Sequence, residues 1–238
     1  MFKAPLVVGY KGEIGSFLLQ GLLRIMPKAS DIWCYDKEAT AGEAFDRLEK
    51  ADVVFLCVPI QETASWIQKH HHQFWKREHS KVLIEQTSLK DPLRKEFRDL
   101  PILSMHVLFR PSATPNPQDR CIALIQHPLW KTYAPLIQQM TQASLIYYNS
   151  IQEHDREMAL QQALTHRLIL ILNSLYERQR LPIGKTYISQ QVQALAHRIQ
   201  QGDRVLYQTI QSNRFLSQAL RALEKQLRQF DITKQIQG

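Results

Sequence analysis

The fold of this chain is decided by residues 5–15, PLVVGYKGEIG. A short apolar run passes directly into Gly9, Gly12 and Gly15, and the next residues, SFLLQGLLRIM (16–26), have apolar side chains at helical spacing. Strand, glycine turn and helix in this order are typical of a βα unit that binds a dinucleotide. A glycine at 12 lets the backbone approach a pyrophosphate, and a glycine at 15 lets the helix pack closely on the strand.

A carboxylate at the end of the second predicted strand strengthens this interpretation. Asp36 closes residues 31–36, where it can accept hydrogen bonds from ribose hydroxyls and repel a 2′-phosphate, so we expect NAD rather than NADP. Tyr10 departs from the usual G-x-G-x-x-G pattern, and the rival interpretation is a tight turn that binds no ligand. The candidate cofactor-binding residues are Gly9, Lys11, Gly12, Glu13, Ile14, Gly15, Asp36, Val58 and Pro59.

Strands and helices alternate through the first 150 residues. The predicted strands are 5–9, 31–36, 52–58, 81–85, 102–106 and 121–126, and the predicted helices are about 13–26, 40–49, 61–77, 91–98 and 128–142. Alternation of this kind predicts a parallel sheet with helices on both faces. The expected fold class is therefore α/β, with a Rossmann-type dinucleotide-binding domain over 1–150.

Residues 151–238 have a different composition, with apolar residues at helical spacing and no strand pattern. We expect one long helix from 151, a break at LPIGK (181–185), and two further helices at roughly 187–201 and 203–229. Three helices with broad apolar faces do not enclose a large core of their own. The sequence therefore predicts an all-α substrate and dimerisation domain over 151–238, which completes its core against a second copy.

The composition excludes several classes of protein. Hydrophobic residues make up 44% of the 238 residues and charged residues 22%, which is ordinary for a folded globular protein. No apolar run reaches the ~18 residues that span a bilayer, so we expect no membrane partner. The N-terminus, MFKAPLVVGY, lacks the pattern of a secretory signal, and a cytoplasmic location is the expectation.

The net charge of +8 is compatible with an anionic partner, which charge alone does not identify. The arginines of the C-terminal helices interleave with glutamines, and no nucleic-acid-binding motif is present, so we expect no nucleic-acid partner. Three widely spaced cysteines offer no disulfide framework. The adjacent histidines at 70–72 lack the spacing that metal ligands on one helix need, and we expect no metal site.

Three further segments contain candidate catalytic or substrate-binding residues: EQTSLK (85–90), SMHVLFRP (104–111) and EHDREMALQQALTH (153–166). In this order, and after the glycine turn, they resemble the prephenate and arogenate dehydrogenases of tyrosine biosynthesis. That family has a serine-x-lysine segment, a G-x-H-P-M-F-G-P loop, and a helical domain that opens with E-H-D-x-x-M-A-x-x-Q-x-L-x-H. The resemblance covers most of residues 5–175. It implies NAD-dependent oxidative decarboxylation of prephenate to 4-hydroxyphenylpyruvate, or of arogenate to tyrosine.

The resemblance also assigns roles to individual residues. His106 matches the catalytic histidine, which polarises or deprotonates the substrate hydroxyl, and Ser88 matches the serine between that histidine and the nicotinamide. Only a neutral imidazole accepts a proton, so an unperturbed pKa near ~6.5 is expected to suit His106. Asp155, Gln162 and His166 are spaced by seven and four residues, which predicts a common helix face. The resemblance places His166 in the substrate pocket.

Some positions depart from the family pattern. Val107 and Arg110 replace its proline and glycine, and Gln190 falls where the family keeps a carboxylate-binding arginine, in a register anchored on Tyr207. Arg110 is the candidate to supply the missing charge. Two alternatives stay open: a related NAD-dependent oxidoreductase for another carboxylated alcohol, and a degenerate dinucleotide-binding protein without turnover. The candidate substrate-binding residues are His166, Gln162, Arg110 and Gln190.

Overall fold

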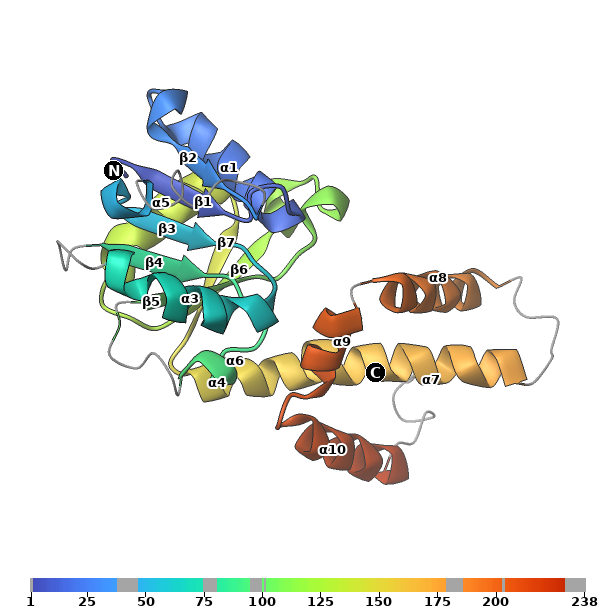
Figure 1. The fold of residues 1–238 in the computed structure, drawn as a ribbon. Coiled ribbons are helices and arrows are strands. Elements are labelled where there is room, and N and C mark those ends of the chain that lie inside the picture. Colours follow the sequence, from blue (N-terminus) through green and yellow to red (C-terminus); the bar gives the residue numbers. More distant parts are fainter. Residues whose placement is uncertain are drawn as a thin grey trace. The chain divides into compact units, whose positions relative to one another are not determined.

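The computed structural model describes residues 2–37, 47–74, 81–94, 100, 102–178, 186–202 and 204–229. The chain divides into two compact units, Met1–His154 and Asp155–Gly238 (Figure 1). Most of the predicted helix over 40–49 and the predicted break at 181–185 lie outside the described residues. Within the described residues, no helix combines the length and the hydropathy that crossing a membrane requires.

A seven-stranded sheet forms the centre of the N-terminal unit, in the order β2-β1-β3-β4-β5-β6-β7. Its strands are β1 (Pro5–Val8), β2 (Trp33–Tyr35), β3 (Val53–Leu56), β4 (Val82–Glu85), β5 (Ile102–Val107), β6 (Cys121–Ile125) and β7 (Ser144–Tyr148). The neighbouring strands from β2 to β5 run parallel, which confirms the predicted arrangement for that part of the sheet.

The expectation of a wholly parallel sheet is wrong at β6, which pairs antiparallel with β5. The connection between these strands contains only two short 3₁₀ turns, η2 (Pro111–Ala113) and η3 (Pro117–Asp119). A parallel return needs a longer crossover, usually through a helix. The chain therefore comes back in the opposite direction.

The expectation of six strands is also wrong, because β7 adds a seventh beside β6. Its sequence, SLIYY, contains apolar side chains that the fold leaves accessible: Ile146 is 44% exposed and Tyr147 is 54% exposed. An edge strand of this kind lacks the burial pattern by which the central strands are recognised in the sequence.

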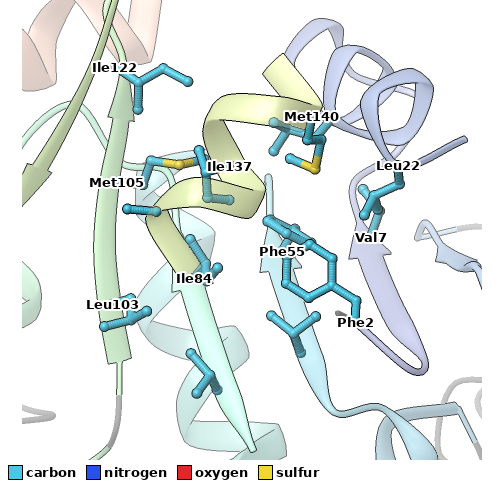
Figure 2. Packing of buried hydrophobic residues seen from close by; sticks show 14 of the residues in the cluster. Phe2, Val7, Leu22, Phe55, Ile84, Leu103, Met105, Ile122, Ile137 and Met140 are labelled. Atoms are coloured by element: carbon cyan, nitrogen blue, oxygen red, sulfur yellow. The ribbon is translucent and has the colours of Figure 1, made fainter. Parts of the chain in front are cut away.

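Helices cover both faces of the sheet and enclose its core. The helices and 3₁₀ turns that precede or cover the strands are α1 (Glu13–Ile25), η1 (Ala29–Asp31), α3 (Ile60–Phe74), α4 (Asp91–Arg94) and α5 (Trp130–Thr141). Figure 2 shows one face, where Val7, Phe55 and Ile84 from the strands belong to one buried cluster with Leu22 of α1 and Met140 of α5. Successive strand residues alternate between the two faces, so each central strand contributes to both cores.

The second face carries its own cluster. Leu6, Val54 and Leu83 lie on this side of the sheet and pack with Ile67 and Phe74 of α3. β1, β3 and β4 are buried along their whole length as a result. This burial explains their continuous apolar sequences.

The helical unit begins within α6 (Ile151–Met158). The chain then continues without a break through η4 (Ala159–Leu164) and α7 (Thr165–Arg178). The expected long helix from residue 151 is present, and its middle segment η4 is a π-helix rather than an α-helix. Its wider turn changes the backbone hydrogen bonding. Two backbone carbonyls of the π-helix accept hydrogen bonds from side chains. Thr165 Oγ1 donates to the Leu160 carbonyl at 3.1 Å, and Gln211 Nε2 donates to the Ala163 carbonyl at 2.8 Å.

The remaining helices are α8 (Tyr187–Gln201), α9 (Arg204–Gln211) and α10 (Leu216–Gln229). The predicted helix over 203–229 is therefore broken in two. Asn213 lies in the break, where its Oδ1 accepts a hydrogen bond from the Phe215 N–H at 2.9 Å and its Nδ2 donates to the Asp155 carbonyl at 2.7 Å. The buried apolar cluster of this unit is small: Ala163, Leu164, Ile210, Leu216 and Ala219.

Candidate active site

The glycine turn between β1 and α1 is closed by backbone contacts that only glycine permits. Gly9 has a φ of +77°, and its N–H donates to the Tyr35 carbonyl at 2.8 Å. A Cβ on Gly9 would lie 2.5 Å from the Cys57 carbonyl oxygen. Gly9 therefore meets the need for a left-handed residue in the turn. Tyr10 is accommodated beside it, packed half-buried against the core.

The first turn of α1 offers an open place for an anion. Gly12 is the N-cap residue, and among the described residues no side chain caps the helix. A Cβ on Gly12 would meet only the Gly9 carbonyl oxygen, at 3.3 Å, whereas a Cβ on Gly15 would clash with the backbone of the turn. The N–H groups at the start of a helix and its dipole favour negative charge. These residues fit the pyrophosphate of a dinucleotide.

Asp36 follows β2 and lies against the glycine turn. Its Oδ2 accepts a hydrogen bond from the Lys11 N–H at 3.2 Å, and its Oδ1 accepts one from the Lys37 N–H at 2.9 Å. The carboxylate is partly exposed and has further acceptor capacity for ribose hydroxyls. Val58 is half-buried and Pro59 is exposed after β3, whose carboxyl end lies at the same sheet edge.

Glu13, in the first turn of α1, accepts hydrogen bonds from the loop after β5. One carboxylate oxygen accepts hydrogen bonds from the Ser112 N–H, at 2.9 Å, and from the Ser112 hydroxyl. The other accepts from Arg110 Nε at 3.2 Å. Burial raises the pKa of Glu13, but the hydrogen bonds from Ser112 and the charge of Arg110 outweigh it and lower the pKa below 4.5. The Arg110 side chain is 67% exposed.

His106 lies on β5, near the carboxyl end of the parallel strands. Its side chain is buried, and its Nδ1 lies 3.1 Å from Nε2 of His154, which is fully buried. The two rings meet edge to face with their centroids 5.3 Å apart, and the ring of Tyr148 meets His154 in the same way at 5.3 Å. The sheet edge that carries the glycine turn therefore also carries a buried pair of imidazoles.

A buried ion pair supports the strand that carries His106. Lys90 Nζ lies 2.7 Å from Glu85 Oε1 and also donates to the Met105 carbonyl at 2.7 Å. The other oxygen of Glu85 accepts from the Thr87 N–H at 2.7 Å and the Thr87 hydroxyl at 2.6 Å. These bonds tie the segment after β4 to β5. Ser88 lies half-buried within that segment.

The surroundings of His106 lower the pKa of its imidazole. Burial lowers its pKa well below the ordinary value of 6.5, and the charge of Lys90 and the neighbouring His154 act in the same direction. The expectation of an unperturbed pKa near ~6.5 is therefore wrong, because the sequence does not reveal the burial or the cation beside this imidazole. His106 is neutral at physiological pH.

In the helical unit, Gln162 and His166 carry polar atoms that lack a partner. Gln162 Oε1 and His166 Nδ1 are buried, and neither has a hydrogen-bond partner among the described residues. The His166 ring stacks on Tyr207 with 6.3 Å between centroids, and burial lowers its pKa. Buried polar atoms without partners are uncommon in folded proteins and indicate a place for a ligand or water.

The spacing of seven and four predicts one common helix face for Asp155, Gln162 and His166. That prediction assumes α-helical geometry throughout, whereas the π-helix η4 intervenes and changes the angular positions of the residues after it. Asp155 is 2% exposed. Gln190, the remaining substrate-binding candidate, is exposed on α8.

His154 contacts the proposed site residue His106 but does not stand out in the sequence as an individual candidate. It stands between Glu153 and Asp155 in the E-H-D segment, but the pairing with His106 joins residues 48 positions apart. No periodicity links the two segments. The E-H-D segment draws attention to this histidine, but nothing in the sequence indicates that it pairs with His106.

No family model and no curated protein matches the chain. Solved structures do match it. The structure of prephenate dehydrogenase from Aquifex aeolicus, in complex with hydroxyphenyl propionate and NAD⁺, has a TM-score of 0.70 at 14% identity, covering 96% of this chain and 89% of that one. A Corynebacterium glutamicum protein, provisionally assigned as a prephenate dehydrogenase, has a TM-score of 0.73 at 17% identity, covering 96% and 81%.

Reductases with a related fold match less closely. An imine reductase from Myxococcus stipitatus, in complex with NADP⁺, has a TM-score of 0.55 at 15% identity, covering 84% of this chain and 73% of that one. The N-terminal unit is thus a Rossmann-type domain, and it is followed by a helical unit. This chain has the fold of the prephenate dehydrogenase structures.

Proposed function

We propose that this chain is an NAD-dependent dehydrogenase that oxidatively decarboxylates prephenate or arogenate. The observation that carries the proposal is His106, a buried neutral imidazole on the sheet edge that also holds the uncapped glycine turn. Ligands of open α/β sheets bind at the carboxyl ends of the strands. The fold and the motifs quoted above support the same reaction class.

The glycine turn and Asp36 are the proposed NAD site. The N–H groups at the start of α1 bind the pyrophosphate, and the absence of a Cβ at Gly12 lets it approach. Asp36 is already held against the turn by the Lys11 N–H and accepts hydrogen bonds from the ribose. NAD supplies the hydride acceptor when it is bound. Lys11, Glu13, Ile14, Val58 and Pro59 complete the proposed cofactor-binding set.

His106 is the proposed base. Prephenate carries a hydroxyl at C4 of a cyclohexadiene ring and a carboxylate on the opposite ring carbon. Transfer of the hydroxyl proton to His106, loss of hydride from C4 to the acceptor that bound NAD would supply, and departure of carbon dioxide would leave an aromatic phenolate. His106 would then return the proton to the phenolate oxygen. A neutral imidazole can accept this proton, and the lowered pKa keeps His106 neutral. Ser88 is proposed to lie between His106 and the nicotinamide.

Four residues are proposed as substrate contacts: Gln162, His166, Arg110 and Gln190. Gln162 and His166 present buried polar atoms for which a hydroxyl or carboxylate of the substrate is a suitable partner. Arg110 provides a guanidinium that is largely exposed. Gln190 is proposed as a neutral contact in the place where related enzymes keep an arginine.

A direct test is the absorbance of reduced nicotinamide with NAD or NADP and either substrate. We expect turnover with NAD on prephenate, arogenate or both. His106→Asn keeps the size and polarity of the side chain and should lower kcat by roughly 10²–10⁴-fold while NAD still binds. Near-parental turnover in this variant contradicts the assignment of His106. A parent that binds NAD but oxidises neither compound acts on another carboxylated alcohol or has lost turnover.

We also propose that the helical unit forms a homodimer. Most of the large apolar side chains that are exposed in the described residues belong to this unit: Leu160, Ile171, Leu172, Leu175, Tyr187, Ile188, Leu195, Val205, Leu206 and Leu227. Exposed apolar surface of this extent is typical of an interface. Light scattering at micromolar concentration should give the mass of two chains, and Ile171→Asp should shift the mass toward one.

A further inference from the structure

The hydrogen bond between His106 and His154 has a direction that the proposed chemistry depends on. It joins Nδ1 of His106 to Nε2 of His154 at 3.1 Å. A neutral imidazole carries one proton, so one of these nitrogens donates and the other accepts. If His106 donates, its Nε2 has a free lone pair. If His154 donates, Nε2 of His106 carries the proton and cannot accept another.

Both imidazoles are buried. His106 is 4% exposed and His154 is 0% exposed, with the ring of Tyr148 edge-on to His154. The ammonium group of Lys90 bonds to the Met105 carbonyl, next to His106 in the chain. The charged groups near His106 on β4 and the following segment are Lys90 and its partner Glu85, and the charge of Lys90 disfavours a second proton on His106. The lowered pKa of His106 keeps that imidazole neutral.

We propose that His154 is a positioning residue that accepts the Nδ1 proton of His106 and thereby fixes the tautomer in which Nε2 is the base. The assignment rests on the proposed function for the role of His106. When Nε2 takes the hydroxyl proton of the substrate, the N–H bond at Nδ1 stays intact and continues to donate to His154. The new proton therefore arrives without a prior rearrangement of the pair.

Two amide substitutions provide a matched test. In His154→Gln the amide reaches the place of Nε2, and its oxygen can accept from His106. In His154→Asn the same amide is one carbon shorter and leaves the Nδ1 proton of His106 without a buried acceptor. We expect His154→Gln to retain kcat within about threefold and His154→Asn to lower it roughly 10–100-fold, the range for an unsatisfied buried donor. The dissociation constant for NAD should change little in either.

Nitrogen-15 NMR of histidine-labelled protein reads the tautomer without any turnover. The signals of His106 are identified by their loss in His106→Asn. We expect the Nδ1–H form in the parent and in His154→Gln, and a larger share of the Nε2–H form in His154→Asn. A merely structural role for His154 would lower stability without changing this ratio.

Two results overturn the proposal: an Nε2–H tautomer of His106 in the parent, or equal kcat and equal tautomer ratios in the two variants. A parent without turnover on either substrate contradicts the proposed function instead, and the NMR comparison still decides the role of His154. If His154→Asn does not fold, the parent and His154→Gln spectra decide it, because both must show the Nδ1–H form.

Discussion

Glu13 and Arg110 lie 97 residues apart in the sequence and are joined by a hydrogen bond from Nε to the carboxylate at 3.2 Å. Glu13 begins α1 directly after the glycine turn, and Arg110 follows the strand that carries His106. The bond uses Nε and orients the rest of the guanidinium. The two segments that carry the proposed cofactor and base are therefore linked to each other.

Arg110→Gln should raise the KM for the carboxylated substrate roughly tenfold, because an amide cannot replace a charge-assisted bidentate bond. Steady-state kinetics and NAD titration separate substrate from cofactor effects. Stability should fall by at most about 1 kcal/mol, since the ion pair is largely exposed. Glu13→Gln is the control and should change KM less. An unchanged KM with weaker NAD binding would assign Arg110 to the cofactor.

The pH dependence of kcat/KM should lack an acid limb at pH 6.5. The folded-state pKa of His106 is lowered, chiefly by burial, so the imidazole stays a base until the pH falls well below that value. The same shift affects stability: the unfolded chain binds the proton more readily, so stability is complete above the unfolded pKa and is lost as pH falls through the folded one. Activity that falls with an apparent pKa of about 6.5 contradicts this placement of His106.

Asp36→Ser should raise the ratio of NADP to NAD affinity roughly 10–100-fold, because it removes a negative charge that would face a 2′-phosphate. Fluorescence titration with the two reduced cofactors measures the ratio. Asp31→Ser makes the same change before β2, in η1, and should leave the ratio unaltered. A parent that already prefers NADP would show that Asp36 does not face the ribose.

Lys90→Met should lower the free energy of unfolding by about 3–5 kcal/mol, the usual cost of leaving one member of a buried ion pair without its partner. Urea denaturation measures the loss. The double variant Lys90→Met/Glu85→Leu removes both charges and should be more stable than Lys90→Met alone. Equal or greater instability in the double variant would mean that the hydrogen bonds of Thr87 to Glu85 dominate.

The parts of the fold that the sequence predicted are those governed by local rules. The glycine turn is one example, since the backbone at Gly9 and Gly15 excludes a Cβ. The central strands are another, because β1, β3 and β4 are buried on both faces and therefore apolar along their length.

The features that were not predicted depend on contacts between residues that lie far apart in the sequence. The antiparallel pairing of β6 is decided by its neighbour β5, and the break at Asn213 is stabilised by a bond to Asp155. The lowered pKa of His106 arises from burial and from Lys90, and its partner His154 comes from another segment. Periodicity and spacing along one segment carry no information about such pairs.

The uneven division of buried apolar residues has a thermodynamic consequence. The sheet unit has two extensive clusters, whereas the helical unit has one small cluster around Ala163 and Leu216. Chains of this kind do not unfold in a single cooperative step, so one melting temperature does not describe them. If the helical unit completes its core in a dimer, its melting varies with protein concentration, while that of the sheet unit is set within a single chain.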